Sequence, residues 1–475
     1  MSFHPAPNDP FLEFMRPPHD ETPAQRTARI QREHEAQLIS DEIDEDIRRQ
    51  RVRLKKEKNV IKILLLGQAE SGKSTTLKNF RMKWAPETWA RERNGWRVIV
   101  QFNVVRALVA ILRAFEADMN GNYATDDGDI MPELLDSPLP YTEAHQLLLI
   151  RLAPLRGLET DLKRRLGAGA PEQPPYVNSP MSPTPFETPV LIPYARRVVE
   201  FSVRTWEDIV APNGHSHVPD GGVDYITETL VSCKDDMIAL WTDPLAQQVV
   251  RRRRVSLPDS HQYFLDALDR IASLNYVVTD NDIVRARLRT TGVTSHSIVF
   301  RQSPDNPQKV WEWRIYDVGG CRTQRAAWMS FFENTHVILF LCPMNVFDER
   351  LHEDPRVNRL EDSLILWQSI CSSKLLAKTQ LIMFLNKTDL LKRKLKKGIR
   401  VSDYLPSYGT RPNEVNHVSK YFKEKCKEIL HTYSPEPRTH YMYFTTVTDT
   451  TATSKTLESI RDGVLRENLT TSQLI

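Results

Sequence analysis

The sequence predicts an α/β protein with a six-stranded, mostly parallel sheet covered by helices on both faces, an inserted all-α domain and an N-terminal helix. Three observations favour this fold class. Short apolar runs rich in β-branched residues alternate with helical patterns, as they do in parallel sheets. Residues 80–280 interrupt the alternation with helical patterns and no clear strand signal. The 475 residues also exceed the usual size of one domain.

The expected strands are short apolar runs bounded by turn residues. They cover Val60–Leu66, Ser297–Arg301, Trp311–Asp317, His336–Cys342, Gln380–Asn386 and His440–Thr446. Helices are expected after the later strands at Arg356–Cys371, Asn413–His431 and Ser454–Leu469, and inside the insert at Phe102–Glu116, Tyr141–Leu152, Tyr225–Trp241 and Ser260–Ser273.

These patterns and the local composition divide the chain. A Pro-rich, polar leader covers 1–22, a polar helix 23–58, the α/β domain 59–80 and 281–475, and the helical insert 81–280. The polar helix is either a solvated surface helix or a partner-binding helix.

The helical insert contains a Pro-rich, low-complexity loop at about 154–200, densest in proline between residues 171 and 193. Proline at this density excludes a helix interior or a central strand. The loop is most simply an inert linker. Its P-x-x-P spacings leave open a second possibility, docking into an aromatic groove of a partner.

Composition excludes several classes of protein. The net charge is +3, from 64 basic and 61 acidic residues, which gives no field that favours nucleic acid. The five cysteines are odd in number and never form C-x-x-C, which indicates a reducing compartment without a disulfide framework. No apolar run approaches the roughly 20 residues of a membrane span. Ser2 replaces the glycine needed for N-myristoylation, and no cysteine precedes Cys233, so we expect no N-terminal lipid acceptor.

A phosphate-binding loop is predicted directly after the first strand. Residues 67–74, GQAESGKS, fit G-x-x-x-x-G-K-[ST] between a strand and a helix, a context that makes chance occurrence improbable. Its glycines let backbone N–H groups surround a phosphate at the start of the helix. Lys73 would reach the β- and γ-phosphate oxygens, and the Ser74 hydroxyl would bind Mg²⁺.

Asn386-Lys387-Thr-Asp389 follows the fifth predicted strand, where ligands bind in parallel sheets. The Asp389 carboxylate can accept hydrogen bonds from N1–H and the 2-amino group of guanine, a pair of donors that adenine lacks. Asn386 and Lys387 would brace the loop and the ring. Alone this motif is weak, but together with the phosphate loop it selects a guanine nucleotide over ATP.

Two further segments carry suitable chemistry. Asp317-Val-Gly-Gly320 ends a strand and would place a carboxylate near the metal and a flexible glycine pair near the γ-phosphate. The run from Asp282 to Gly292 is basic and hydroxylated. Thr290 could complete the Mg²⁺ shell, and one guanidinium could neutralise charge on the transferred phosphoryl group.

In this order the motifs GQAESGKST, DIVRARLRTTG, DVGG-C-R, FLNKTDL and FTTVTDT resemble those of the alpha subunit of a heterotrimeric G protein. The resemblance covers about residues 35–470, apart from much of 117–225. Among members of this family, the chain resembles fungal ones with long insertions. It implies a P-loop, Ras-like GTPase domain at 59–80 and 281–475 that binds GTP or GDP with Mg²⁺.

The resemblance also implies a role for each site residue. The implied sets are Gly67, Ala69, Glu70, Ser71, Gly72, Lys73, Ser74, Thr75 and Gly320 for phosphate; Asn386, Lys387, Asp389 and Val447 for guanine; Arg285, Arg287, Thr290, Thr291, Gly292, Asp317, Gly319 and Gly320 for the switch segments; Ser74, Thr290 and, through water, Asp317 for Mg²⁺; and Arg287, Lys73 and Cys321 for catalysis. Val447 would present its N–H to the guanine oxygen, and an Arg-rich switch helix would run from Cys321 to Phe332.

The implied partners are a beta-gamma dimer, a seven-helix receptor, an effector and a regulator of hydrolysis, with no nucleic acid. The implied location is cytoplasmic and peripheral, on the inner face of the plasma membrane. The implied function is signal transduction by a GTP/GDP switch that couples the receptor to the effector.

Three departures from the family pattern affect the mechanism. Cys321 occupies the position of the glutamine that orients the attacking water, and a thiol is a poor hydrogen-bonding group. Ala69 replaces a glycine beside the γ-phosphate. Thr446 and Val447 replace Cys-Ala under the guanine. We therefore expect slow GTP hydrolysis and hypothesise fast nucleotide release.

The alternatives are a GTP-binding switch that does not hydrolyse GTP and is reset by nucleotide exchange, and an ATP-using P-loop kinase, against which the guanine motif argues.

Overall fold

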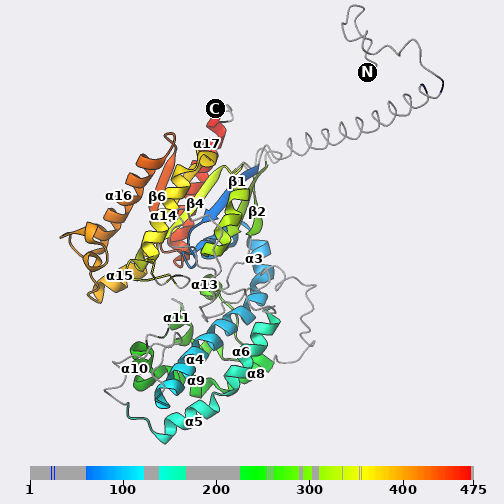
Figure 1. Ribbon diagram of the computed structural model, residues 1–475. Coiled ribbons are helices and arrows are strands. Elements are labelled where there is room, and N and C mark those ends of the chain that lie inside the picture. Colours follow the sequence, from blue (N-terminus) through cyan, green and yellow to red (C-terminus); the bar gives the residue numbers. More distant parts are fainter. Residues whose placement is uncertain are drawn as a thin grey trace, which may run out of the picture. The chain divides into compact units, whose positions relative to one another are not determined.

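The computed structural model describes residues 60–121, 139–166, 225–253, 260–287, 293–301, 310–333, 335–351 and 356–471, with isolated positions at 23, 26, 255, 257 and 354. The chain divides into two compact units, Met1–Val60 and Ile61–Ile475. The predicted leader 1–22 and nearly all of the predicted helix 23–58 lie outside the described residues. Figure 1 shows the elements of the second unit.

The predicted six-stranded, mostly parallel sheet is confirmed, with the strand order β2-β3-β1-β4-β5-β6. The strands are β1 (Val60–Leu66), β2 (Val293–Arg301), β3 (Val310–Val318), β4 (Val337–Pro343), β5 (Gln380–Asn386) and β6 (His440–Phe444). Strand β4 pairs in parallel with β1 and β5, and β5 with β6, whereas β2 and β3 form an antiparallel pair at one edge. All residues of β4 and β5 are buried, as expected for central strands covered on both faces.

The helices that accompany the sheet bury both of its faces. They are α2 (Lys73–Trp84), α14 (Arg359–Ser372), α15 (Thr388–Lys396), α16 (Val415–Tyr433) and α17 (Thr450–Thr471). Because successive side chains of a strand point to opposite faces, β1 supplies Leu64 and Leu66 to the core cluster under α14, α15 and α16, and Ile63 and Leu65 to the cluster under α2 and α17.

Short 3-10 helices connect several of these elements. They are η2 (Arg93–Gly95), η4 (Arg322–Phe331), η5 (Met344–Val346), η6 (Lys374–Leu376), η7 (Val401–Asp403) and η8 (Pro406–Tyr408). The predicted helix from Cys321 to Phe332 is therefore present as the 3-10 segment η4.

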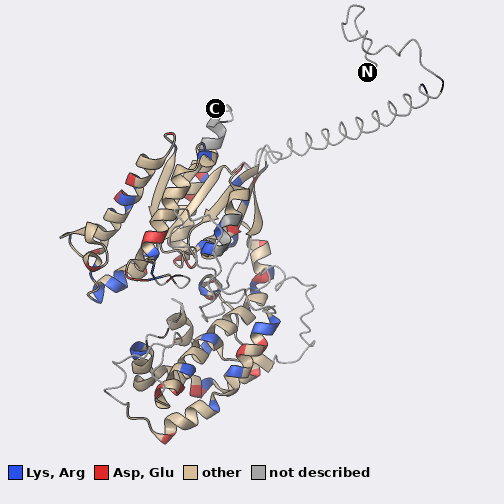
Figure 2. Ribbon diagram, viewed as in Figure 1, with Lys and Arg blue, Asp and Glu red and all other residues tan. Residues whose placement is uncertain are grey.

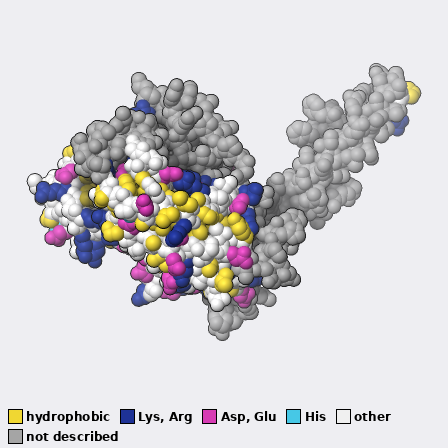
Figure 3. All heavy atoms as spheres, turned by 90° about the horizontal axis from the view of Figure 1, so that it is seen from below, with side chains coloured by type: hydrophobic (Ala, Val, Ile, Leu, Met, Phe, Trp, Pro, Cys, Tyr) yellow, Lys and Arg dark blue, Asp and Glu magenta, His cyan; other side chains and the backbone are white. Residues whose placement is uncertain are grey.

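The described helices between α2 and β2 form a third core cluster. These helices are α3 (Pro86–Glu92), α4 (Trp96–Met119), α5 (Glu143–Arg151), α6 (Pro154–Arg165), α8 (Tyr225–Ser232), α9 (Lys234–Thr242), α10 (Pro244–Arg252), α11 (His261–Leu265), α12 (Leu268–Ile271) and α13 (Asp280–Arg285). On the face seen from below in Figure 3, hydrophobic side chains gather among charged ones.

Some predicted boundaries in the helical part are wrong. The predicted helix Tyr225–Trp241 is two helices, α8 and α9, and the predicted helix Ser260–Ser273 is two short helices, α11 and α12. The Pro-rich loop does not begin at about residue 154, because Pro154 starts α6, where its missing N–H costs no hydrogen bond. Residues 167–200 of that loop lie outside the described residues.

Helix α4 is the central helix of this cluster. By length and composition the stretch Pro86–Met119 could cross a membrane, but 72% of its most apolar window is buried inside the protein. Its apolar character is explained by packing in the helical core. All five cysteines belong to the described residues, are buried and form no disulfide.

A buried carboxylate organises the end of the helical part. Thr279 and Asp282 form a capping box at the start of α13. Asp282 also accepts two hydrogen bonds from the Arg270 guanidinium, at 2.8 and 2.7 Å, and one from each hydroxyl of Tyr263 and Tyr276, at 2.9 and 3.0 Å. Burial alone raises the pKa of Asp282, but the hydrogen bonds from Arg270 and Thr279 outweigh it and lower the pKa to about 2.

We expect Asp282→Asn to lower the free energy of unfolding by about 2 kcal/mol at pH 7, because it replaces the charged acceptor of the two Arg270 hydrogen bonds by a neutral amide, while the partly exposed Arg270 stays solvated. The folded pKa lies below the unfolded value, so the stabilisation is present above about pH 4 and is lost as the pH falls through about 2. Thermal unfolding followed by circular dichroism should show the two proteins converging across that range. Asp269→Asn is the control, since this side chain is 83% exposed. A difference that persists unchanged at pH 2 would contradict the assignment.

Candidate nucleotide-binding site

A cavity of about 510 Å³, within the range of small-molecule sites, lies where the loops after β1, β3, β5 and β6 meet. Its lining comprises Ala69, Glu70, Gly72, Lys73, Ser74, Thr75, Lys78, Ser260, Gln262, Tyr263, Asp266, Val284, Arg285, Ala286, Arg287, Val318, Gly320, Cys321, Asn386, Lys387, Asp389, Leu390, Arg393, Thr446, Val447 and Thr448. The cavity therefore joins the predicted phosphate loop to the predicted guanine motif.

Not every predicted site residue lines this cavity. Gly67, Ser71, Asp317 and Gly319 are not among the lining residues. The predicted switch residues Thr290, Thr291 and Gly292 lie outside the described residues.

At two positions of the loop after β1, the backbone has a positive φ angle that glycine adopts more easily than other residues. Gly67 and Gly72 have φ angles of 141° and 106°, and a Cβ on Gly72 would lie 2.5 Å from the Asn386 side-chain nitrogen. The Lys73 ammonium donates to the carbonyls of Gly67 and Gln68, each at 2.8 Å. These contacts curl the loop over the start of α2, where N–H groups can receive an anion.

Two oxygen groups meet beside Lys73. The Ser74 hydroxyl donates to the Asp317 carboxylate at 2.7 Å. A hydroxyl and a carboxylate this close form part of the oxygen-rich environment that Mg²⁺ prefers, so the residues fit the predicted metal. Thr290, the third predicted ligand, lies outside the described residues.

Asn386 joins the loop after β1 to the segment after β6. Its amide donates to the Ser71 carbonyl at 2.8 Å and accepts from the Thr445 hydroxyl and the Val447 N–H, each at 3.2 Å. The Val447 N–H, which we predicted to face the guanine oxygen, is thus directed to Asn386 in this structure. The Val447 side chain belongs to the core cluster under α2 and α17, and fast nucleotide release caused by its methyl groups stays a prediction.

Asp389 and Lys387 occupy the mouth of the cavity. Lys387 adopts a left-handed backbone conformation, with φ of 63°, directly before α15. The Asp389 carboxylate is 42% exposed and lies 3.6 Å from the Arg393 guanidinium one turn later. The basic residues that follow on α15 are the blue stretches of its ribbon in Figure 2. The carboxylate is therefore accessible to a ligand.

Arg287, the arginine predicted to act in catalysis, is held from two sides. Arg287 forms an ion pair with Glu70 of the phosphate loop. Its backbone N–H and carbonyl each bond to the Asn103 side chain on α4, at 3.0 Å. The guanidinium thus lies next to the phosphate loop, as its predicted role requires.

The segment after β3 packs directly on the phosphate loop. A Cβ on Gly320 would lie 2.4 Å from the Ala69 nitrogen and 2.5 Å from the Lys73 ammonium, so a larger residue cannot be accommodated here. The Trp328 indole donates to the Gly319 carbonyl at 2.9 Å and anchors η4. Cys321 is buried, 4% exposed, and lines the cavity.

Sequence reasoning missed several cavity residues, because no motif marks them. Lys78 donates to the carbonyls of Ile283 and Ala286, at 2.9 and 2.7 Å, and so joins α2 to the end of α13. Burial lowers the pKa of Lys78 to about 7. Tyr263 lines the cavity, and Asn103 holds the backbone of Arg287; both lie on helices that carry no recognisable motif.

Comparison with known proteins agrees with this geometry. The family described as G-protein alpha subunit matches residues 37–464. The alpha-4 subunit of a guanine nucleotide-binding protein from Mycosarcoma maydis is 29% identical, over 98% of this chain and 96% of the relative. An alpha-2 subunit from Neurospora crassa is 29% identical, over 90% and 94%, and an alpha subunit from Candida albicans is 26% identical, over 92% and 95%.

The match covers most of the chain and includes every element around the cavity. The chain therefore belongs to the G-protein alpha subunit family and is a nucleotide-binding signal transducer of a heterotrimeric G protein.

Proposed function

We propose that the cavity binds GTP and GDP with Mg²⁺ and that the chain switches between these states while slowly hydrolysing GTP. One observation carries the proposal: Lys73 and Ser74 line the same cavity as Asp389. A single nucleotide can therefore place its phosphates on the loop after β1 and its guanine at the mouth.

In this proposal the loop from Gly67 to Thr75 and Gly320 receive the phosphates. Asn386, Lys387, Asp389 and Val447 surround the guanine. Mg²⁺ would be held by Ser74, Thr290 and, through water, Asp317, and when bound it would neutralise charge on the β- and γ-phosphate oxygens. Cationic side chains gather in the cavity, which suits a polyphosphate.

Hydrolysis requires water to attack the γ-phosphorus in line with the bond to the GDP oxygen, which breaks as the new bond forms. Arg287 must turn from Glu70 to the γ-phosphate to neutralise the developing charge, and the contacts of Asn103 hold its backbone in place for this. Cys321 offers a weakly hydrogen-bonding thiol where a water must be oriented. We therefore propose slow turnover, with a non-hydrolysing switch reset by nucleotide exchange as the second candidate.

We propose further that residues 81–280 form a separate inserted domain, since the core cluster of the helices from α3 to α13 shares no residue with the two clusters beside the sheet. G-protein alpha subunits generally act with a beta-gamma dimer and a receptor. For this chain we propose in addition an effector, a regulator of hydrolysis and reversible attachment to the inner face of the plasma membrane, with no role for nucleic acid.

We expect Asp389→Asn to weaken GTP binding about 100-fold, because the amide presents a donor to a base that also donates. Equilibrium binding of labelled GTP to the purified chain measures this. In wild type, unlabelled GTP should displace the label and ATP should not. Asp403→Asn, an exposed aspartate on η7, is the matched control. Equal competition by ATP and GTP would refute the guanine assignment.

We expect Cys321→Gln to accelerate single-turnover GTP hydrolysis about 100-fold, because glutamine can accept a hydrogen bond from water and donate one to the γ-phosphate. Release of labelled phosphate from preloaded protein reports the rate. Cys321→Ala should hydrolyse at the wild-type rate. No acceleration in the glutamine variant would show that another group orients the water.

A further inference from the structure

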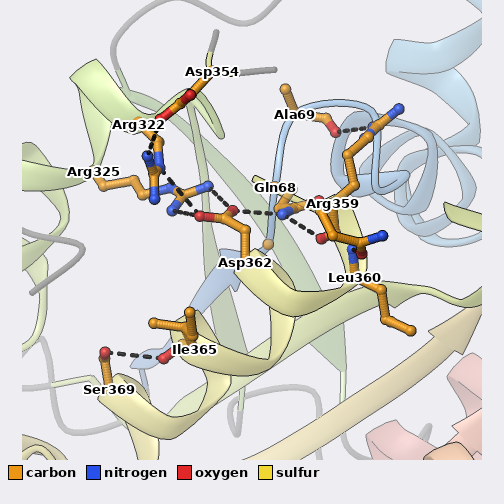
Figure 4. Close-up of polar contacts among 12 residues, drawn as sticks. Gln68, Ala69, Arg322, Arg325, Asp354, Arg359, Leu360, Asp362, Ile365 and Ser369 are labelled. Carbon is orange, nitrogen blue, oxygen red and sulfur yellow. Dashed lines mark hydrogen bonds and ion pairs between the residues drawn. The ribbon is translucent and has the colours of Figure 1, made fainter. Parts of the chain in front are cut away.

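Gln68, the second residue of the phosphate loop, lies outside the cavity and is not explained by nucleotide binding. Its side chain is 2% exposed and points from the loop toward α14 (Figure 4). The side-chain nitrogen donates to the Arg359 carbonyl at 2.7 Å and to the Asp362 carboxylate at 2.5 Å. Both partners are acceptors only, so the amide nitrogen must face them.

Asp362 is also the anchor of the segment after β3. It accepts two hydrogen bonds from the Arg325 guanidinium, at 3.1 and 2.6 Å, and one from Arg322 at 3.2 Å. Asp362 and Arg325 are each 1% exposed. Burial alone raises the pKa of Asp362, but Arg325 outweighs it and keeps the pKa below its usual value, so the carboxylate is charged.

The phosphate loop and η4 therefore meet the same carboxylate. Gln68 reaches it from the loop, and Arg322 and Arg325 reach it from η4. A second contact lies nearby, where Gly320 packs on the peptide between Gln68 and Ala69. Arg359, from the same turn of α14, donates to the Ala69 carbonyl at 3.2 Å. Within the described part of the chain, the side-chain oxygen of Gln68, Oε1, has no hydrogen-bond partner. The amide therefore acts through its NH₂ group alone.

We propose that Gln68 is a positioning residue that couples the phosphate loop to the switch segment, residues 321–332, through Asp362. This inference rests on the proposed GTP switch. By hydrogen bonding the carboxylate that holds Arg325, Gln68 favours the arrangement in which Gly320 lies against the loop and its N–H can meet a γ-phosphate. In this proposal the hydrogen bond between Gln68 and Asp362 is made in the GTP arrangement only, so it stabilises the GTP state and leaves the GDP state unchanged.

The test compares the dissociation rates of two nucleotides from Gln68→Met. This substitution keeps the volume of the side chain and removes the amide. We expect a slowly hydrolysed GTP analogue to dissociate about tenfold faster than from wild type, the effect of one hydrogen bond to a charged group, while GDP dissociates at the wild-type rate. Dissociation of fluorescent analogues from the full chain measures both rates.

The matched control is Gln101→Ala. Gln101 is fully buried on α4, and its amide donates to the Thr227 hydroxyl on α8 at 3.0 Å. Neither residue belongs to the phosphate loop or the switch segment. Its loss should affect both nucleotides alike. Equal effects of Gln68→Met on the GTP analogue and GDP, or no effect on either, would overturn the inference. Failure of wild type to bind either guanine nucleotide would instead overturn the proposed function.

Hydrogen–deuterium exchange gives a second readout that does not depend on dissociation. With the GTP analogue bound, residues 321–332 of Gln68→Met should exchange about tenfold faster than in wild type, whereas α16 should be unchanged. Unchanged protection of the switch segment would contradict the coupling. If Gln68→Met does not fold, Gln68→Leu provides the same comparison with a smaller apolar side chain.

Discussion

The whole site depends on one backbone constraint, the tight curl of the loop between β1 and α2. The curl needs two glycines with positive φ, because side chains at these positions would collide with Asn386 or the end of β4. It brings the carbonyls of Gly67 and Gln68 to the Lys73 ammonium and leaves N–H groups at the start of α2. Three other parts of the site contact this loop: Asn386, Gly320 and the first turn of α14.

The sequence predicted the central strands well, because their stability depends on burial. Strands β1 and β5 match the predicted ranges, since most of their residues are apolar and a turn follows each strand. Strand β2 begins earlier than predicted, because its polar N-terminal half is held by pairing with β3, which an apolar pattern does not reveal. The 3-10 form of η4 depends on tertiary contacts, such as that of Trp328 with Gly319.

The same distinction applies to the site. Motifs predicted the residues of the phosphate loop and the guanine motif, because local spacing determines how a loop wraps a ligand. They missed Asn103 and Lys78, which act on residues about 200 positions later in the chain and show no local pattern. The contact of the Val447 N–H with the guanine oxygen stays a prediction; in this structure the N–H donates to the Asn386 side chain at 3.2 Å, a partner that no local pattern indicates. Which acceptor a backbone N–H meets depends on tertiary contacts, which a local sequence pattern does not show.

Because every thiol is buried, alkylation of the cysteines reports when parts of the protein open. Four of the five cysteines lie in core clusters, whereas Cys321 begins the switch segment and lines the cavity. An alkylating reagent can reach a buried sulfur only when its surroundings open. Modification at Cys321 therefore records excursions of the segment around it, and modification at the other four records loss of the folded cores. Mass spectrometry of one native sample could separate local motion from global unfolding without any introduced label.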